Sequence, residues 1–169
     1  MSVSKFRVLL IPLLLLALAG ALVFFVGSKD SAPDVKFTTL AGQEIHMRDL
    51  RGKIVLVNFW ATTCPGCIEE MPELVETYKQ YRDRGFEVIA VAMTYDPPNQ
   101  VMNYTRKNDL PFPVALDVQG DIAKSFNDVQ LTPTAFVVDK EGRIVRNVVG
   151  VLDFKALRAM LDEQLGKKS

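Results

Sequence analysis

The run Ile54–Phe59 places the tightest constraint on how this chain folds. Its sequence, IVLVNF, is almost entirely apolar and rich in β-branched side chains, so a strand formed by it needs cover on both faces. Arg51-Gly52-Lys53 supplies a turn before the run, and residues 65–84 follow it with helical spacing. The run therefore predicts a central strand in a sheet that carries helices.

The rest of the chain alternates between strand and helix patterns. In chain order, the expected elements are strands at 35–40, 43–47, 54–59 and 86–93, with a helix at 65–84, then helices at 97–108 and 120–126, strands at 134–138 and 143–149, and a helix over 154–165. This order predicts an α/β fold with a central mixed β-sheet flanked by helices and an N-terminal β-hairpin extension. The chain of 169 residues fits one such domain, residues 33–169, plus an appendage.

An almost unbroken apolar run, residues 8–27, precedes this domain. Its length matches a helix that spans a bilayer, whereas the apolar part of a secretory signal peptide is usually shorter. Cleavage at Ala19-Gly20-Ala21 is the alternative, but it would leave the apolar residues 22–26 at the new terminus. We therefore expect an uncleaved transmembrane anchor.

Lys5 and Arg7 set the orientation expected for that anchor. Basic residues before a membrane helix keep that end of the chain in the cytoplasm. Residues 1–7 are then a cytoplasmic segment, and residues 28–32 a short linker on the other side. This predicts a single-pass protein of the inner (cytoplasmic) membrane whose folded domain is periplasmic or otherwise extracytoplasmic.

Cys64 and Cys67 are the only cysteines in the chain. A structural disulfide stabilises by closing a long loop, and this pair closes almost none. A zinc site would need more ligands, and the other soft candidate, His46, is far upstream without a second cysteine pair. Twenty basic residues balance twenty acidic ones, which gives no electrostatic reason to bind nucleic acid. We expect the pair to be chemically active, with no metal.

The pair lies where a buried strand passes into the first turn of a helix. Free N–H groups and partial positive charge at a helix N-terminus favour a thiolate at Cys64. Pro65 suits the first helical position, which leaves Cys64 exposed and draws Cys67 inward. Cys64 would then attack a disulfide in a partner, and Cys67 would resolve the mixed disulfide. The dithiol carries the electrons itself, so no bound cofactor is expected, but an outside reductant must reopen the bridge.

Several motifs identify a family resemblance over residues 33 to 165. They are Gly52-Lys53 before the strand, Asn58-Phe59-Trp60-Ala61-Thr62 before the cysteines, Glu70-Met71-Pro72 after them, and the later Thr132-Pro133-Thr134. On these motifs the chain resembles the TlpA/ResA-type, membrane-anchored thioredoxin-like proteins of the redoxin (AhpC-TSA) superfamily. The resemblance implies a thioredoxin-like fold and a thiol:disulfide oxidoreductase with a redox-active Cys64–Cys67 disulfide.

The resemblance also implies supporting site residues. Pro133, after Thr132, would be a cis-proline beside the cysteines that shapes the substrate groove and discourages metal capture; the sequence alone permits a trans bond as well. Glu70 would be a partly buried carboxyl that moves protons to or from the thiols, because thioredoxin's buried Asp is replaced here by Asn58. A solvated helix residue is the alternative for Glu70, as expected for Glu69.

Three further residues, Trp60, Pro65 and Gly66, would shape the active site. Trp60 is expected to pack against the sheet. The Pro65-Gly66 pair differs from the Gly-Pro of thioredoxin, and this pair helps to set the reduction potential. Thr63 stands where the family commonly has Trp, so the surface around Cys64 is less aromatic.

By the same resemblance, the chain would reduce disulfides of extracytoplasmic client proteins, for example in cytochrome c maturation or copper-centre assembly. A transmembrane thiol carrier of the DsbD/CcdA type would supply electrons, and the protein would act as a monomer. A peroxiredoxin-like thiol peroxidase is the enzymatic alternative, but it needs Thr or Ser where Ala61 stands. A non-enzymatic Cu(I) or haem-assembly chaperone is the other, because two thiolates suit Cu(I).

Overall fold

The computed structural model describes residues 31–166. The predicted anchor at residues 8–27 lies outside the described residues. Within residues 31–166, no helix combines the length and hydropathy that crossing a bilayer requires. In chain order the elements are β1 (Lys36–Thr38), β2 (Glu44–His46), η1 (Met47–Leu50), β3 (Ile54–Trp60), α2 (Pro65–Tyr81), η2 (Arg82–Arg84), β4 (Phe86–Ala92), α3 (Pro98–Lys107), β5 (Val114–Leu116), α4 (Asp121–Ser125), β6 (Thr134–Val138), β7 (Ile144–Val149) and α5 (Phe154–Leu165).

A five-stranded mixed sheet forms the centre of the domain, in the order β5-β4-β3-β6-β7. β3 pairs in parallel with β4 and antiparallel with β6, and β4 pairs in parallel with β5. All seven side chains of β3 are buried, as the apolar run predicts. The mixed α/β sheet flanked by helices is therefore confirmed.

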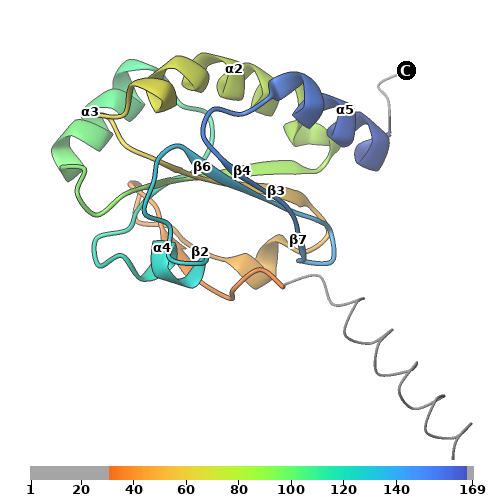
Figure 1. The fold of residues 1–169 in the computed structure, drawn as a ribbon, viewed down its shortest axis with the longest axis horizontal. Helices are drawn as coiled ribbons and strands as arrows, with labels where there is room; N and C mark the ends of the chain where they lie inside the picture. Colours follow the sequence, from red (N-terminus) through yellow and green to blue (C-terminus); the bar gives the residue numbers. More distant parts are fainter. Residues whose placement is uncertain (1–30, 167–169) are drawn as a thin grey trace, which may run out of the picture. The chain divides into compact units, whose positions relative to one another are not determined.

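The two faces of the sheet are covered by different layers (Figure 1). Helices α2, α3 and α5 lie on one side, while α4 and the β1–β2 hairpin lie on the other. Because side chains alternate along a strand, β3 sends Leu56 and Trp60 toward the first layer and Phe59 toward the second. Phe59, Phe126 and Phe136 pack with ring centroids 5.1 to 6.0 Å apart beneath the sheet. Asn58 therefore belongs to the face that α2 covers.

The predicted elements differ from the structure by more than one residue at three places, and the other boundaries agree to within one residue. The N-terminal hairpin forms, but each strand is only three residues long. The helix predicted to reach residue 84 ends at Tyr81, and a 3-10 turn continues to Gly85, whose positive φ of 100° ends it. Strand β5 is absent from the sequence-based prediction because it has three residues and follows Pro113. Its pairing with β4 completes the second parallel crossover.

Ser31 and Ala32 contact the β6–β7 hairpin. Ser31 forms an antiparallel bridge with Arg143, and the Ala32 N–H donates to Gly142 O at 2.9 Å. The sequence predicts a linker at residues 28–32, which includes these two residues. In the structure, their backbone is hydrogen-bonded to the domain.

Leu74 tests whether α2 owes its stability to the sheet beneath it. The side chain is fully buried in the core between α2 and the sheet, so Leu74→Ala should lower the free energy of unfolding by about 2–5 kcal/mol. Gln80→Ala, on the exposed side of the same helix, should change it by less than about 0.5 kcal/mol. Urea unfolding of the full-length protein, followed by the fluorescence of its single tryptophan, measures both. Equal effects would contradict this packing.

Candidate active site

The cysteine pair begins α2 directly after the central strand. Trp60 ends β3, a short turn follows, and Cys64 is the N-cap residue with extended backbone angles. Pro65 occupies the first helical position, where its missing N–H removes no helical hydrogen bond. The Cys64 N–H donates to Ala61 O at 3.2 Å, which closes the turn. This local sequence places a sulfur atom at a helix N-terminus.

Cys64 and Cys67 form a disulfide with their Cα atoms 5.3 Å apart. Cys67 is completely buried, whereas Cys64 is partly exposed. The Cys67 N–H donates to Cys64 Sγ at 3.2 Å. After reduction, this N–H and the helix N-terminus would stabilise a thiolate on Cys64. A partner can therefore reach Cys64 Sγ, and the buried Cys67 Sγ is close enough to attack Cys64 Sγ in a mixed disulfide.

Pro133 packs beside the start of α2. The Thr132–Pro133 peptide bond is cis, as the resemblance implied. A methyl group added to Gly66 would lie 3.6 Å from Pro133 Cδ and only 3.2 Å from Val151 Cγ2. The absence of a side chain at Gly66 therefore allows the helix to approach the proline loop closely. The roles of Thr132, Pro133, Pro65 and Gly66 in substrate binding stay predictions.

Glu70 lies in the core, one helical turn beyond Cys67, with only 2% of its surface exposed. Its Oε2 accepts a hydrogen bond from the Leu152 N–H at 3.1 Å, and its Oε1 accepts one from Asn58 Nδ2 at 3.4 Å. Burial raises the pKa of Glu70, and the two hydrogen bonds oppose this only in part. A carboxyl with a raised pKa next to a thiol pair is suited to proton transfer.

Asn58 makes this site tolerant of both protonation states. Asn58 Oδ1 is buried and has no hydrogen-bond partner among the described residues. The orientation of an amide is assigned from its hydrogen bonds. A protonated Glu70 can therefore donate its O–H to the Asn58 oxygen if the amide turns over, while an ionised Glu70 accepts from the amide nitrogen. Neither state leaves the carboxyl without a partner.

Trp60 and Thr63 differ in their exposure. Trp60 is fully buried, and its ring packs at 5.3 Å between centroids against Tyr104 of α3. Its side chain has no exposed surface for a partner to contact, and a role in shaping the site stays a prediction. Thr63 is exposed and immediately precedes Cys64, so the surface next to the reactive sulfur carries a small polar side chain.

Sequence reasoning did not find two residues at this site. Leu152 reaches Glu70 through its backbone N–H, which no sequence pattern reveals. Asp96 accepts hydrogen bonds from the Thr62 N–H and hydroxyl, next to the cysteines. One signal was available, because Asp96 follows β4 just as Cys64 follows β3, and loops after adjacent parallel strands meet at one edge of the sheet.

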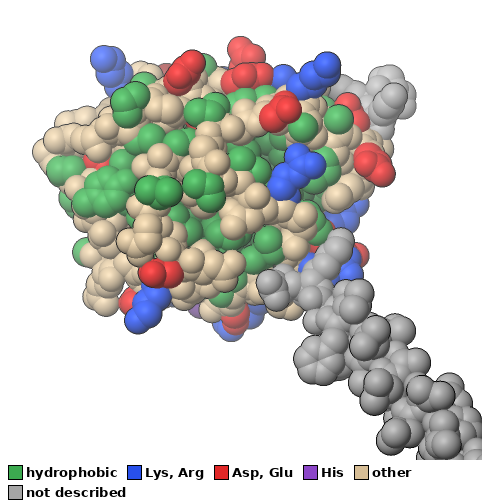
Figure 2. Space-filling model, in the orientation of Figure 1, with side chains coloured by type: hydrophobic (Ala, Val, Ile, Leu, Met, Phe, Trp, Pro, Cys, Tyr) green, Lys and Arg blue, Asp and Glu red, His purple; other side chains and the backbone are tan. Residues whose placement is uncertain are grey.

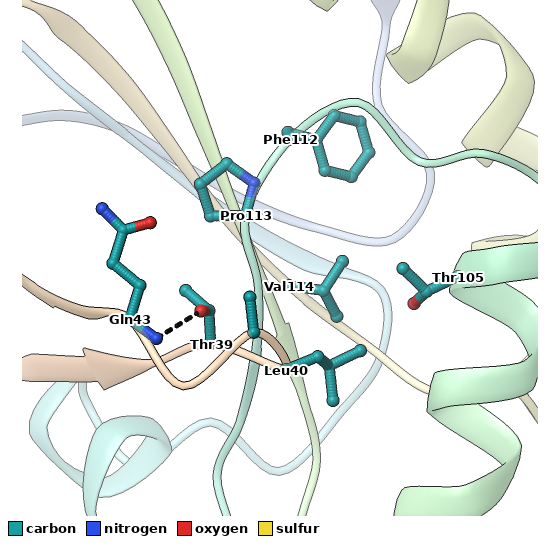
Figure 3. A pocket seen from close by; sticks show the side chains of 8 residues that line it. Thr39, Leu40, Gln43, Thr105, Phe112, Pro113 and Val114 are labelled. Atoms are coloured by element: carbon teal, nitrogen blue, oxygen red, sulfur yellow. Dashed lines mark hydrogen bonds between the residues drawn. The ribbon is translucent and has the colours of Figure 1, made fainter.

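A separate cavity of about 270 Å³ lies between the N-terminal hairpin, β5 and α3 (Figure 3). Thr39 accepts a hydrogen bond from the Gln43 N–H at its rim, and Leu40, Phe112 and Val114 make it largely apolar. None of its lining residues belongs to the cysteine site. In residues 31–166, no group of three or more His, Cys, Asp or Glu side chains is arranged to hold a metal ion.

Known proteins resemble this chain in sequence over most of its length. The redoxin family profile matches residues 27–161. The thiol-disulfide oxidoreductase ResA of Bacillus cereus (strain ATCC 10987 / NRS 248) is 35% identical over 175 residues, covering 97% of this chain and 98% of that protein. ResA of Bacillus subtilis (strain 168) is 32% identical over 127 residues, covering 75% of this chain and 70% of that protein.

Solved structures share the fold. A thiol:disulfide interchange protein of the thioredoxin family from Chlorobium tepidum TLS superimposes with a TM-score of 0.75 at 28% identity, covering 83% of this chain and 99% of that one. The pneumococcal exposed lipoprotein thioredoxin Etrx1 from Streptococcus pneumoniae strain TIGR4 has a TM-score of 0.68 at 26% identity, covering 78% and 99%. With its cysteine pair at the start of α2, the chain belongs to the redoxin family, among its ResA-like thiol:disulfide oxidoreductases.

Proposed function

We propose that this thiol:disulfide oxidoreductase reduces disulfides of client proteins outside the cytoplasm. The unequal exposure of the two sulfur atoms carries the proposal: Cys64 is accessible and Cys67 is not. A client can therefore form a mixed disulfide only with Cys64. The names of the relatives, thiol-disulfide oxidoreductase ResA and thiol:disulfide interchange protein, agree with such exchange.

The exchange proceeds in two displacements. The Cys64 thiolate attacks one sulfur of the client disulfide, which releases the other client sulfur as a thiolate and leaves a mixed disulfide. Cys67 then loses its proton and attacks Cys64 Sγ, which releases the second client sulfur as a thiolate and closes the Cys64–Cys67 bridge. The client gains two electrons, its two thiolates take up protons from solvent, and the dithiol is oxidised. An external dithiol must return the electrons.

Glu70 is the base proposed for the second displacement. Cys67 is buried, so solvent is poorly placed to take its proton, and Glu70 lies one helical turn away on the same face. Ionised Glu70 accepts the proton and is held in position by Leu152 and Asn58. When an external dithiol reduces the bridge, protonated Glu70 returns the proton.

Exposed apolar residues near the Thr132–Pro133 loop and Gly66 support the proposal that the clients are proteins. Tyr95, Leu131, Val149 and Val151 are each more than half exposed. Tyr95 Oη lies 3.0 Å from Thr132 Oγ1, Leu131 precedes Thr132, Val149 is paired with Thr134, and Val151 lies next to Gly66. On the face in Figure 2, hydrophobic side chains gather across the middle of the domain, and charged ones lie mostly along its margins. Exposed apolar patches of this kind mark sites of protein contact.

The anchor and the electron donor complete the proposal. The apolar run at residues 8–27 would hold the domain at the outer surface of the inner membrane, and Lys5 and Arg7 would keep the N-terminus inside. Disulfides are favoured outside the cytoplasm, so a reductase there needs electrons delivered through the membrane. A DsbD/CcdA-type carrier would supply them, and clients in cytochrome c maturation or copper-centre assembly would consume them.

Trapping separates the roles of the two cysteines. In cells that produce the full-length chain, Cys67→Ser should accumulate mixed disulfides with clients, because the resolving sulfur is gone. Cys64→Ser should form none and lose all exchange activity. Acid quenching, alkylation and non-reducing electrophoresis of the membrane fraction detect the adducts, and the double variant is the control. Adducts that form with Cys64→Ser but not with Cys67→Ser would reverse the assignment.

The Glu70→Gln variant tests the proposed base. It should remove the dependence of the resolving step on ionisation of Glu70 and slow that step at pH 7 by about 10²-fold, the lower range for acid–base catalysis. Stopped-flow reduction of a test disulfide measures this rate as a function of pH. A range of about pH 4 to 9 covers the ordinary pKa values of carboxyls and thiols. Glu69→Gln, on an exposed neighbour, is the matched control.

Stability gives an independent reading of the same substitution. Burial raises the pKa of Glu70 above its ordinary value of 4.5, so the folded protein holds this proton more tightly than the unfolded chain does. Its contribution to stability is full below the unfolded pKa and is lost as the pH rises through the folded pKa. Glu70→Gln should therefore gain stability relative to the original protein as the pH rises. If Glu70→Gln and Glu69→Gln have the same stability profile with pH, the pKa of Glu70 is not raised in the folded protein.

A further inference from the structure

Asp96 is a buried carboxyl beside the cysteine site that the exchange mechanism leaves without a role. It lies four residues beyond the end of β4, and only 3% of its surface is exposed. β3 and β4 are parallel, with Trp60 opposite Ala92, and the Met93 N–H extends this pairing to Trp60 O at 3.1 Å. The loops that follow the two strands therefore lie together, and they carry Cys64 and Asp96.

Both carboxylate oxygens of Asp96 are used by one residue, Thr62. Oδ2 accepts from the Thr62 N–H at 2.6 Å, and Oδ1 accepts from Thr62 Oγ1 at 2.5 Å. Thr62 Oγ1 also lies 3.2 Å from Gln100 Oε1 of α3. Hydrogen bonds to an ionised carboxylate are shorter and stronger than neutral ones. Thr62 is therefore fixed at both its backbone and its side chain.

No Lys, Arg or His side chain within residues 31–166 forms an ion pair with Asp96. A buried carboxylate without a cation is costly unless donors satisfy it, and the donors here all come from the turn that precedes Cys64. The Asp96 N–H in turn donates to Met93 O at 3.0 Å, which fixes its own loop. Asp96 therefore accepts hydrogen bonds from a turn whose other contacts include those of the Cys64 N–H with Ala61 O and of Thr62 Oγ1 with Gln100 Oε1.

We propose that Asp96 is a positioning residue for thiol exchange: by holding Thr62, it keeps Cys64 Sγ at the N-terminal N–H groups of α2. Thr62 is two residues before Cys64, so a shift of this turn moves the sulfur relative to the Cys67 N–H that it accepts. The Asp96 carboxylate forms its hydrogen bonds with Thr62 and acts on Cys64 only through that residue. Asp96 would position Cys64 in the same way whether the protein reduces or oxidises its clients.

The electrostatic effect of Asp96 opposes its positioning effect, and this makes the two distinguishable. A nearby negative charge disfavours a thiolate, so loss of the charge alone would lower the pKa of the Cys64 thiol. Loss of the hydrogen bonds would move Cys64 away from the helix N–H groups and raise that pKa. Asp96→Ala removes both the charge and the hydrogen bonds, so the direction of its change in the Cys64 pKa shows which effect dominates.

Asp117 provides a matched control within the same fold. It is equally buried, with 3% of its surface exposed, and follows the next parallel strand, β5. Its two carboxylate oxygens accept from the Ile122 and Ala123 N–H groups, at 3.1 and 2.8 Å, and fix the start of α4. Asp117→Ala removes the same charge and the same number of hydrogen bonds as Asp96→Ala, but at a position that holds no cysteine.

The experiment uses the reduced full-length protein. The pH dependence of Cys64 alkylation by iodoacetamide gives the thiol pKa, and reduction of a test disulfide gives kcat and KM. Asp96→Ala should raise the Cys64 pKa and lower kcat by about tenfold to 10²-fold, as displacements of a reacting group by about 1 Å do. Asp117→Ala should change neither. Thr62→Val, which loses one of the two hydrogen bonds, should act in the same direction, and Thr62→Ser, which keeps both, should restore the original values.

Three results would overturn the proposal. The first is a lowered Cys64 pKa in Asp96→Ala, which would make the charge the dominant effect. The second is an equal change in Asp96→Ala and Asp117→Ala, which would reduce Asp96 to a structural role. The third covers the case in which Asp96→Ala does not fold: a folded Thr62→Val protein with the original alkylation profile would then show that the Thr62 contact does not position Cys64.

Discussion

Burial of β3 on both faces is the constraint on which the domain depends. Each of its side chains must be covered, so the sheet requires a helical layer above and a second layer below. Parallel pairing of β3 with β4 then brings the ends of two strands to the same edge. The cysteine turn and the Asp96 loop meet at that edge, where functional loops of parallel α/β units commonly lie. The site is thus a direct consequence of the packing of the sheet.

The same strand explains how a carboxyl can sit in the core next to two sulfurs. Alternation along β3 turns Asn58 toward α2, and the helix turns Glu70 toward Asn58. A buried carboxyl without hydrogen bonds would be costly, and the Asn58 amide and the Leu152 N–H reduce that cost. They do not abolish it, so the pKa of Glu70 remains raised. A raised pKa brings the carboxyl closer to the pKa of a thiol, as the proton transfer proposed for Glu70 requires.

Local patterns predicted the parts of the protein that depend on neighbouring residues. The spacing of Cys64, Cys67 and Glu70 on one helix was enough to place them together, and the apolar run identified β3. The contacts of Asp96 with Thr62 and of Leu152 with Glu70 join residues 34 and 82 positions apart, and only the tertiary fold brings them together. The sequence pattern did not predict β5. Three residues are too few to show a strand periodicity, and the strand that pairs with β5, β4, is distant in the sequence. The anchor at residues 8–27 remains a prediction from hydropathy.

The reduction potential of the Cys64–Cys67 pair tests the central claim, that this protein is a reductase, most directly. The full-length protein is equilibrated with glutathione or dithiothreitol buffers, and its reduced fraction is measured by alkylation. A reductase should have a potential nearer that of thioredoxin, about −270 mV, than that of the oxidant DsbA, about −120 mV. A value close to that of the oxidant would contradict the assigned direction, because the dithiol would then withdraw electrons from its clients.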